Sequence, residues 1–131
     1  RVLGAPAPHD VRVGCGDLAL DPKDPNVVYA ALYARQRKPW AFDYGVSVTN
    51  GADVGGIFRS ADGGATWTKL SNGLPALTGR IGLSVHARDP RIVYAIVQSD
   101  EGGTSNIDQP LQKKGGVFRS DDGGQRWTRT N

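Results

Sequence analysis

Residues 55–67, GGIFRSADGGATW, recur at 115–127 as GGVFRSDDGGQRW, 60 positions further along the chain. A second pair lies upstream of these segments: DLALDPKDPNVVYAAL at 17–32 corresponds to GLSVHARDPRIVYAIV at 82–97, which is 65 positions later. Two segments that recur in the same order indicate a duplicated structural unit, and such repeats are typical of stacked architectures. One structural unit therefore has to account for both halves of the chain.

Each unit is predicted to form short β-strands. The apolar runs are rich in β-branched and aromatic residues and are too short between turn residues to be helices. Asp-Pro and Asp-Gly-Gly sequences separate the runs and favour tight turns. No helix is predicted. The expected strands are 17–21, 27–34, 55–60 and 66–70 in the first unit, and 80–86, 92–98, 115–120 and 126–130 in the second.

A four-stranded antiparallel meander repeated at this spacing is the blade of a β-propeller. We therefore predict an all-β fold with two four-stranded antiparallel blades of a partial β-propeller, packed face to face because one meander cannot bury both of its faces. A β-sandwich made of two hairpin pairs is the alternative. The predicted organisation is the end of a preceding blade and its connection at 1–16, a blade at 17–70 with its hairpin at 60–67, and a blade at 80–131 with its hairpin at 120–127.

The two repeated hairpins share a pattern of serine, aspartate, glycines and tryptophan. An aspartate in such a turn accepts hydrogen bonds from the turn amides, and the tryptophan covers the hairpin with apolar surface. The pattern resembles the Asp-box of bacterial neuraminidase repeats, with Arg126 in place of the usual threonine. The resemblance implies a structural role for Ser60, Asp62, Gly64, Trp67, Ser120, Asp122, Gly124 and Trp127.

The resemblance extends over most of residues 16–131, including GDLALDPKDPNVVYAAL, GGIFRSADGGATWTKLSNGLP and TGRIGLSV. These stretches resemble large bacterial secreted proteins with sortilin-type Asp-box propellers, which are similar to xyloglucan-degrading glycosyl hydrolases. The resemblance implies a secreted or periplasmic protein. The same architecture hosts sialidases, endoglucanases, sorting receptors and photosystem assembly factors, so it does not fix the function.

A propeller typically needs about four to eight blades, and the sequence predicts two. The expected partners are therefore the remaining blades of a longer chain, or further copies of this chain in a homo-oligomer. The net charge of +3 is mild and its basic residues are dispersed, so no nucleic-acid partner is expected. His9 and His86 lack partners at ligand spacing, and no apolar run has the length of a membrane helix, so we expect no metal, no cofactor and no membrane. Cys15 is predicted to be a small buried hydrophobe.

Alternate connections of an antiparallel meander fall on opposite ends of the blade. The long segments 35–54 and 99–114, with the link 71–79, are therefore expected together at the end opposite the Asp-Gly-Gly hairpins. Long loops on a rigid scaffold favour binding. The candidate binding residues, for a carbohydrate or a protein ligand, are Trp40, Phe42, Tyr44 and Arg37. The alternative is that these aromatic side chains pack their own loop.

Glycoside hydrolysis requires two carboxylates that face each other across a cleft. Asp43 and either Asp100 or Glu101 are weak candidates for such a pair, because acidic loop residues are usually solvated. The sequence shows no Arg-Ile-Pro motif, which makes a sialidase the weaker hypothesis. Two functional hypotheses remain: a glycan- or peptide-binding segment of a secreted propeller, and a part of a glycoside hydrolase.

Overall fold

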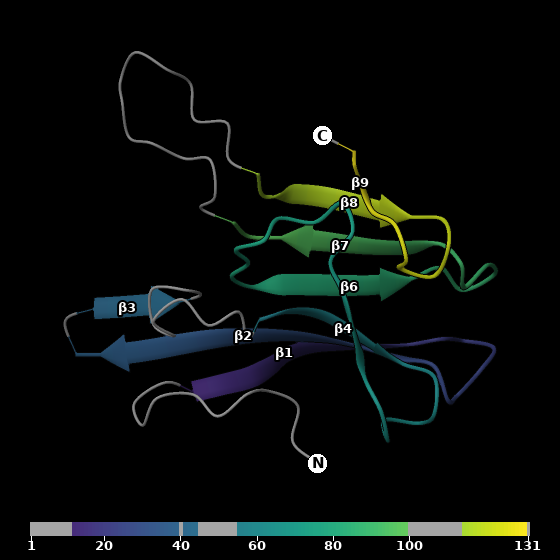
Figure 1. The fold of residues 1–131 in the computed structure, drawn as a ribbon, viewed down its shortest axis with the longest axis horizontal. Helices are drawn as coiled ribbons and strands as arrows, with labels where there is room; N and C mark the ends of the chain where they lie inside the picture. The colour runs from purple at the N-terminus through teal and green to yellow at the C-terminus, as the bar shows by residue number, and fades with distance from the viewer. Residues whose placement is uncertain (1–11, 40, 45–54, 100–113, 131) are drawn as a thin grey trace.

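The computed structural model describes residues 12–39, 41–44, 55–99 and 114–130, and at 12, 36–38 and 41–44 it describes the backbone alone (Figure 1). All the regular elements in these ranges are β-strands. They are β1 (Arg12–Leu20), β2 (Val28–Lys38), β3 (Ala41–Tyr44), β4 (Gly56–Ser60), β5 (Thr68–Leu70), β6 (Ile81–Val85), β7 (Val93–Val97), β8 (Gly116–Ser120) and β9 (Thr128–Arg129).

The strands form two antiparallel sheets. The first has the order β1-β2-β4-β5, with the short β3 added to the far part of β2, and the second has the order β6-β7-β8-β9. Each sheet is thus built on a four-stranded meander, and no helix occurs among the described residues. The predicted fold class is confirmed: the chain is all-β, with two four-stranded antiparallel sheets of the kind that form propeller blades.

The first strand starts earlier than the sequence predicted. β1 begins at Arg12 rather than at residue 17, and its pairing with β2 shifts register between Cys15 and Asp17. Such a bulge leaves one extra residue, Gly16, on the longer strand, and it hides the period-two pattern that identifies a strand. The prediction for Cys15 was wrong for the same reason, because the thiol is exposed on this irregular stretch rather than buried.

The segment 35–54 is also not a simple loop. β2 continues to Lys38 and pairs with β3, with Arg35 opposite Tyr44 and Lys38 opposite Ala41. The sequence reading missed this ribbon because Arg35–Lys38 are all polar and carry no apolar alternation. Pro39, which fits the fixed φ of a turn position, lies in the connection between the two strands.

The two sheets pack face to face, as predicted, and the hydrophobic core lies between them. Its fully buried members come from β2 and β4 of the first sheet, from β6, β7 and β8 of the second, and from the residues just before β2 and β9. β6 lies over β1 and β2 (Figure 1). The buried core residues are Val27, Tyr29, Ala31, Ile57, Ile81, Val93, Ala95, Val97, Phe118 and Trp127.

The two sheets present opposite faces of the repeat to this core. In the first sheet the face with Tyr29, Ala31 and Ile57 is buried, and the repeat places Tyr94, Ile96 and Val117 at the corresponding positions of the second sheet. There the corresponding face points away from the core, and Tyr94 and Ile96 are 37% and 63% exposed. The two units therefore bury opposite faces of the same repeated sheet.

The reciprocal relation holds for the other face. Leu83 and Val85 of the second sheet pack against the core, and their repeat counterparts Leu18 and Leu20 in the first sheet are 61% and 63% exposed. The outer face of each sheet is therefore apolar, and the two outer faces correspond to opposite faces of the repeated unit. We call the face with Leu18 and Leu20 the leading face, and the face with Tyr94 and Ile96 the trailing face.

Polar contacts fix the registration of one sheet on the other. The Tyr29 hydroxyl donates a hydrogen bond of 3.1 Å to the carbonyl of Gly123 in the second hairpin. The amide of Leu83 donates to Asp17 Oδ2 at 2.7 Å, and the amide of Trp127 donates to the carbonyl of Asn72 at 2.9 Å. Because these bonds join segments far apart in sequence, the two units are held in one arrangement rather than merely in contact.

Candidate functional site

The connections of the two sheets separate into two ends, as the meander topology predicted. At one end each hairpin turn contacts the preceding Asp-Pro turn: the amides of Gly63 and Gly123 donate to the carbonyls of Asn26 and Arg91 at 2.9 and 2.8 Å. At the other end Gln98, just after β7, exchanges backbone hydrogen bonds with the end of the inter-sheet link at Gly79 and Arg80. The second end is the one that the long connections enter, and we call it the loop end.

The first hairpin is organised by its own polar side chains. The buried Ser60 hydroxyl donates to Asp62 at 2.7 Å and accepts from the amide of Gly64 at 2.8 Å. Asp62 accepts from both the amide and the hydroxyl of Thr66. The Trp67 indole donates to the carbonyl of Gly64 at 2.9 Å. Local backbone and side-chain bonds therefore use the acceptor capacity of the aspartate.

The second hairpin repeats the serine and aspartate bonds of this network with one substitution, and the buried Trp127 indole nitrogen has no hydrogen-bond partner among the described residues. Ser120 donates to Asp122 at 2.8 Å and accepts from the amide of Gly124 at 2.8 Å, and the amide of Arg126 donates to Asp122 at 2.9 Å. Arg126 lacks the hydroxyl that Thr66 gives to Asp62. The pKa of Asp62 is accordingly lowered to about 2, first by the Thr66 hydroxyl and then by backbone bonding, whereas for Asp122 the backbone of Arg126 is the largest cause of a lowered pKa.

These lowered pKa values predict acid sensitivity of the fold. A carboxyl group whose pKa is 3.8 when unfolded and about 2 when folded stabilises the protein fully above about pH 4, and that stabilisation is lost as the pH falls toward 2. We expect the melting temperature to fall over this window. The difference in melting temperature between the wild-type protein and Asp62→Asn should narrow between pH 6 and pH 2.5. A difference that stays constant with pH would show that the charge on Asp62 does not contribute.

A hollow at the loop end lies between β1, the far part of β2 and the start of β6. Its volume is about 550 Å³, within the roughly 300–1,000 Å³ range of small-ligand sites. The backbone of residues 13–16 forms one wall. Tyr33, Arg35 and Arg80 supply the polar side chains.

Tyr33 interacts with both arginines. Tyr33 and Arg35 lie two residues apart on β2 and hence on one face of the strand, with the guanidinium carbon 6.0 Å from the ring centroid. Burial of Tyr33 favours its neutral form and would raise its pKa. Hydrogen bonding to Arg80 and Arg35, with the charges of both, outweighs burial and holds the pKa of Tyr33 below its ordinary value of 10.0. The hollow is therefore an electropositive environment.

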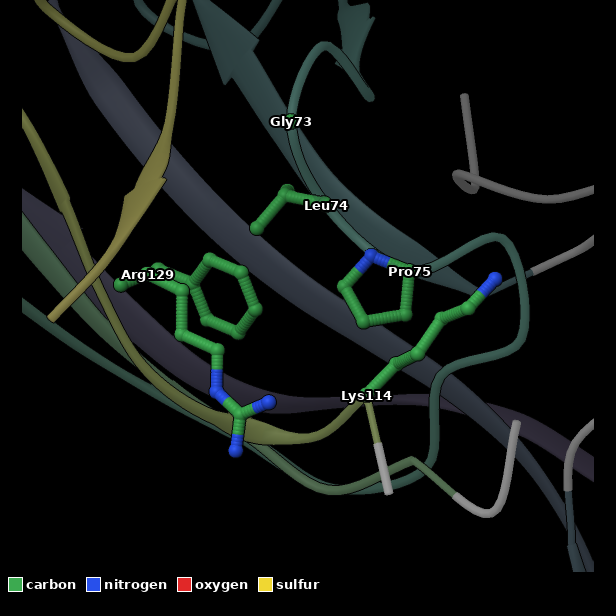
Figure 2. Close-up of a pocket in the computed structure, with 6 residues that line it drawn as sticks. Gly73, Leu74, Pro75, Lys114 and Arg129 are labelled. Carbon is green, nitrogen blue, oxygen red and sulfur yellow. The ribbon is translucent and has the colours of Figure 1, made fainter. Parts of the chain in front are cut away.

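A second hollow of about 260 Å³ lies along the seam between the sheets (Figure 2). Gly73, Leu74 and Pro75 of the inter-sheet link form one side, and Lys114 and Arg129 line the hollow from the second unit. Figure 2 shows the Lys114 side chain extending toward Pro75 and the Arg129 guanidinium pointing away from the link. The buried ring of Phe118 completes its lining. This hollow is smaller than most ligand sites and is bounded by core residues, so we assign it to the packing of the two sheets.

Most of the residues that the sequence suggested for binding or catalysis lie outside the described side chains. Trp40, Asp100 and Glu101 fall outside the described residues altogether. Arg37, Phe42, Asp43 and Tyr44 are described by their backbone only, which places Phe42 opposite Arg37 in the ribbon of β2 and β3. The proposed pairing of Asp43 with Asp100 or Glu101 therefore stays a prediction.

Sequence reasoning missed Tyr33 and Arg80 as site residues. Tyr33 reads as one more apolar residue of a strand, and Arg80 lies 45 positions after Arg35 in the chain. Their association becomes visible only when the first strand of the second unit is placed over the first sheet. Among the residues that the structure describes, no three His, Cys, Asp or Glu side chains gather as metal ligands, and no helix long and apolar enough to span a membrane occurs.

Comparison with known proteins gives one informative similarity. No family model matches the chain. A xyloglucanase from Paenibacillus sp. is 38% identical over 76 residues, which are 58% of this chain and 6% of the length of that protein. The aligned stretch is thus related in sequence to part of a glycoside hydrolase. The chain spans only a small fraction of the length of this relative.

Proposed function

We propose that the chain is a segment of a secreted Asp-box β-propeller that binds a polysaccharide at its loop end. The observation that carries the proposal is the similarity to a xyloglucanase in a chain that folds as two blade-like sheets. The electropositive hollow of about 550 Å³ at the loop end gives a place for a ligand. The Asp-Gly-Gly hairpins lie at the opposite end and are occupied by their own hydrogen bonds, which argues for a structural role.

The Asp-box assignment rests on the two equivalent hairpins. Serine and aspartate make the same local contacts in both copies, apart from the hydroxyl that is missing at Arg126. The tryptophans differ, because the Trp67 indole donates to Gly64 and the buried Trp127 indole nitrogen has no hydrogen-bond partner among the described residues. We assign one blade to 17–70 and one to 80–131, with residues 1–16 leading from a preceding blade. β1 then carries the last part of that connection within the sheet, because it starts at Arg12.

The leading and trailing faces support a larger assembly. The trailing face corresponds by repeat position to the buried face of the first sheet, and the leading face corresponds to the buried face of the second sheet. Because those two buried faces pack against each other, a trailing face should fit a leading face. The partners we propose are the remaining blades of the parent protein or further copies of this chain. Tyr94 illustrates the fit, because its counterpart Tyr29 donates to a hairpin carbonyl of the next sheet.

The proposed ligand contacts lie around the ribbon of β2 and β3, where Trp40, Phe42, Tyr44 and Arg37 occur, next to the hollow with Arg35. Aromatic rings suit the faces of sugar rings, and a tryptophan anchor contributes on the order of 2 kcal/mol to binding. We expect the protein to bind soluble xyloglucan and expect Trp40→Ala to weaken binding by roughly 30-fold. Titration calorimetry with xyloglucan oligosaccharides measures both effects.

The matched control is Trp67→Phe, at the opposite end of the first sheet, which should leave the affinity unchanged. Unchanged affinity of Trp40→Ala with a lowered melting temperature would make Trp40 a residue that packs its own loop. If the wild-type protein binds no polysaccharide, the proposed function is wrong and the segment serves only as scaffold.

A second candidate function is that of a partial glycoside hydrolase, which the name of the relative favours. Asp43, with Asp100 or Glu101, would then be the carboxylates, separated by about 5–5.5 Å in a retaining enzyme or about 6.5–9.5 Å in an inverting one. Release of reducing sugar from xyloglucan by the wild-type protein, and its loss in Asp43→Asn, would support this function. Hydrolysis that persists in Asp43→Asn, in Asp100→Asn and in Glu101→Gln would exclude these residues.

A further inference from the structure

We propose that the hollow formed by Tyr33, Arg35 and Arg80 binds an anionic group carried on a saccharide, either a uronic-acid carboxylate or a sulfate ester. The inference rests on the proposed polysaccharide-binding function and specifies the ligand class. Uncharged polysaccharides are bound by aromatic stacking and neutral hydrogen bonds and do not require two guanidinium groups at one wall. Those two cations are the feature that the proposal explains.

No carboxylate among the residues that the structure describes is paired with the arginines of this hollow. Both arginine side chains are exposed, and the interactions described for them are with Tyr33 rather than with a carboxylate. Within the described ranges, the ion pairs of Arg91 with Asp89 and of Arg119 with Asp121 involve other residues. The hollow therefore holds two positive charges that an oxyanion could neutralise without displacing a protein carboxylate.

The geometry of the three side chains suits an oxyanion. A guanidinium presents several donors in one plane and recognises two oxygens at once. The nearly buried phenol of Tyr33 contacts both arginines and so limits their freedom, which reduces the entropy lost when a ligand orders them. Tyr33 is thus a positioning residue, and Arg35 and Arg80 are the binding residues.

Cys15 provides a reporter for the charge of the hollow. It is the single cysteine of the chain, it is exposed, and it lines the same hollow as the two arginines. We compare the rate of alkylation by the anionic reagent iodoacetate with the rate by neutral iodoacetamide. The ratio of these rates should be higher for Cys15 than for a free thiol in solution. The ratio of the two rates cancels any change in the ionisation of the thiol itself. Arg80→Gln should lower this ratio several-fold, and a saturating anionic saccharide should slow both reactions.

The binding test compares three oligosaccharides of similar length: a galacturonate oligomer, a sulfated oligomer and uncharged xyloglucan. We expect Arg35→Gln and Arg80→Gln to weaken binding of an anionic oligomer by about tenfold or more each. Added salt should weaken it as well. Arg91→Gln removes the same charge at the hairpin end and is the matched control. Thermal melts of each variant show that it is folded, and Tyr33→Phe should have a smaller effect than either arginine variant.

The outcomes separate this inference from the function on which it rests. Tighter binding of the galacturonate oligomer identifies a carboxylate as the ligand, and tighter binding of the sulfated oligomer identifies a sulfate ester. Either result supports the proposal if the arginine variants lose the binding of that oligomer. Binding of xyloglucan alone, or anionic binding that Arg35→Gln and Arg80→Gln leave unchanged, overturns the proposal while polysaccharide binding stands. Absence of binding to all three overturns both.

Discussion

Replacement of Gly73 by alanine is expected to lower the free energy of unfolding by about 2–5 kcal/mol, a large part of the roughly 5–15 kcal/mol of an ordinary domain. Gly73 has a φ of +88°, and a Cβ atom on it would lie 2.0 Å from the carbonyl oxygen of Trp127. The left-handed backbone costs an L-residue about 1–2 kcal/mol, and the overlap adds about 1–3 kcal/mol. The overlap is with backbone and cannot be relieved by a side-chain rotation.

Gly63→Ala is the control that separates these two causes. Gly63 has a φ of +69°, but a Cβ atom there meets only Asn26 Oδ1 at 3.7 Å, which is an ordinary contact. It should therefore cost only the backbone term of about 1–2 kcal/mol. Urea denaturation of the two variants measures the difference. Equal losses would mean that the close approach between the link and Trp127 does not stabilise the pair of sheets.

The importance of Gly73 follows from the burial of the two equivalent tryptophans. Trp127 is 3% exposed and its amide donates to Asn72, so the link of the first unit covers the hairpin of the second. Trp67 has no preceding link over it among the described residues and is only partly buried. The same motif is therefore more deeply packed where a neighbouring sheet precedes it, as expected for a stacked repeat.

The sequence was sufficient to predict the fold because local and long-range signals agreed. The repeated Asp-Gly-Gly turns and the short β-branched runs specify hairpins, and the repeat itself specifies how many there are. It was insufficient at Arg12–Gly16 and Arg35–Lys38, where a bulge and a polar ribbon lack the alternation of a half-buried strand. Those two stretches border the hollow at the loop end.

The candidate site was only partly predictable for a related reason. The topology correctly placed the strand ends that the long connections join opposite the hairpins, and the position of the connections themselves stays a prediction. The association of Tyr33 with Arg80 depends on how β6 of one unit lies over β2 of the other, and no local pattern records that arrangement. A site at the seam between repeats is therefore harder to read from sequence than the repeats themselves.

We propose that the leading and trailing faces are complementary, and we expect this complementarity to produce a head-to-tail association of the chain. Leu20→Glu places a charge on the leading face, and Ile96→Glu places one on the trailing face; both wild-type side chains are 63% exposed, so neither change disturbs the core. The buried counterparts of these faces form a heterologous contact, in which unlike surfaces meet. The effect expected from one charge in an apolar interface is loss of association.

Light scattering coupled to size-exclusion chromatography at increasing protein concentration measures this association. The wild-type protein should associate, and each single variant should be monomeric because it keeps only one kind of face. An equimolar mixture of Leu20→Glu and Ile96→Glu should form a one-to-one dimer, since the intact trailing face of the first meets the intact leading face of the second. A wild-type protein that stays monomeric, or a mixture that stays monomeric while the wild-type protein associates, would contradict the complementary-face account.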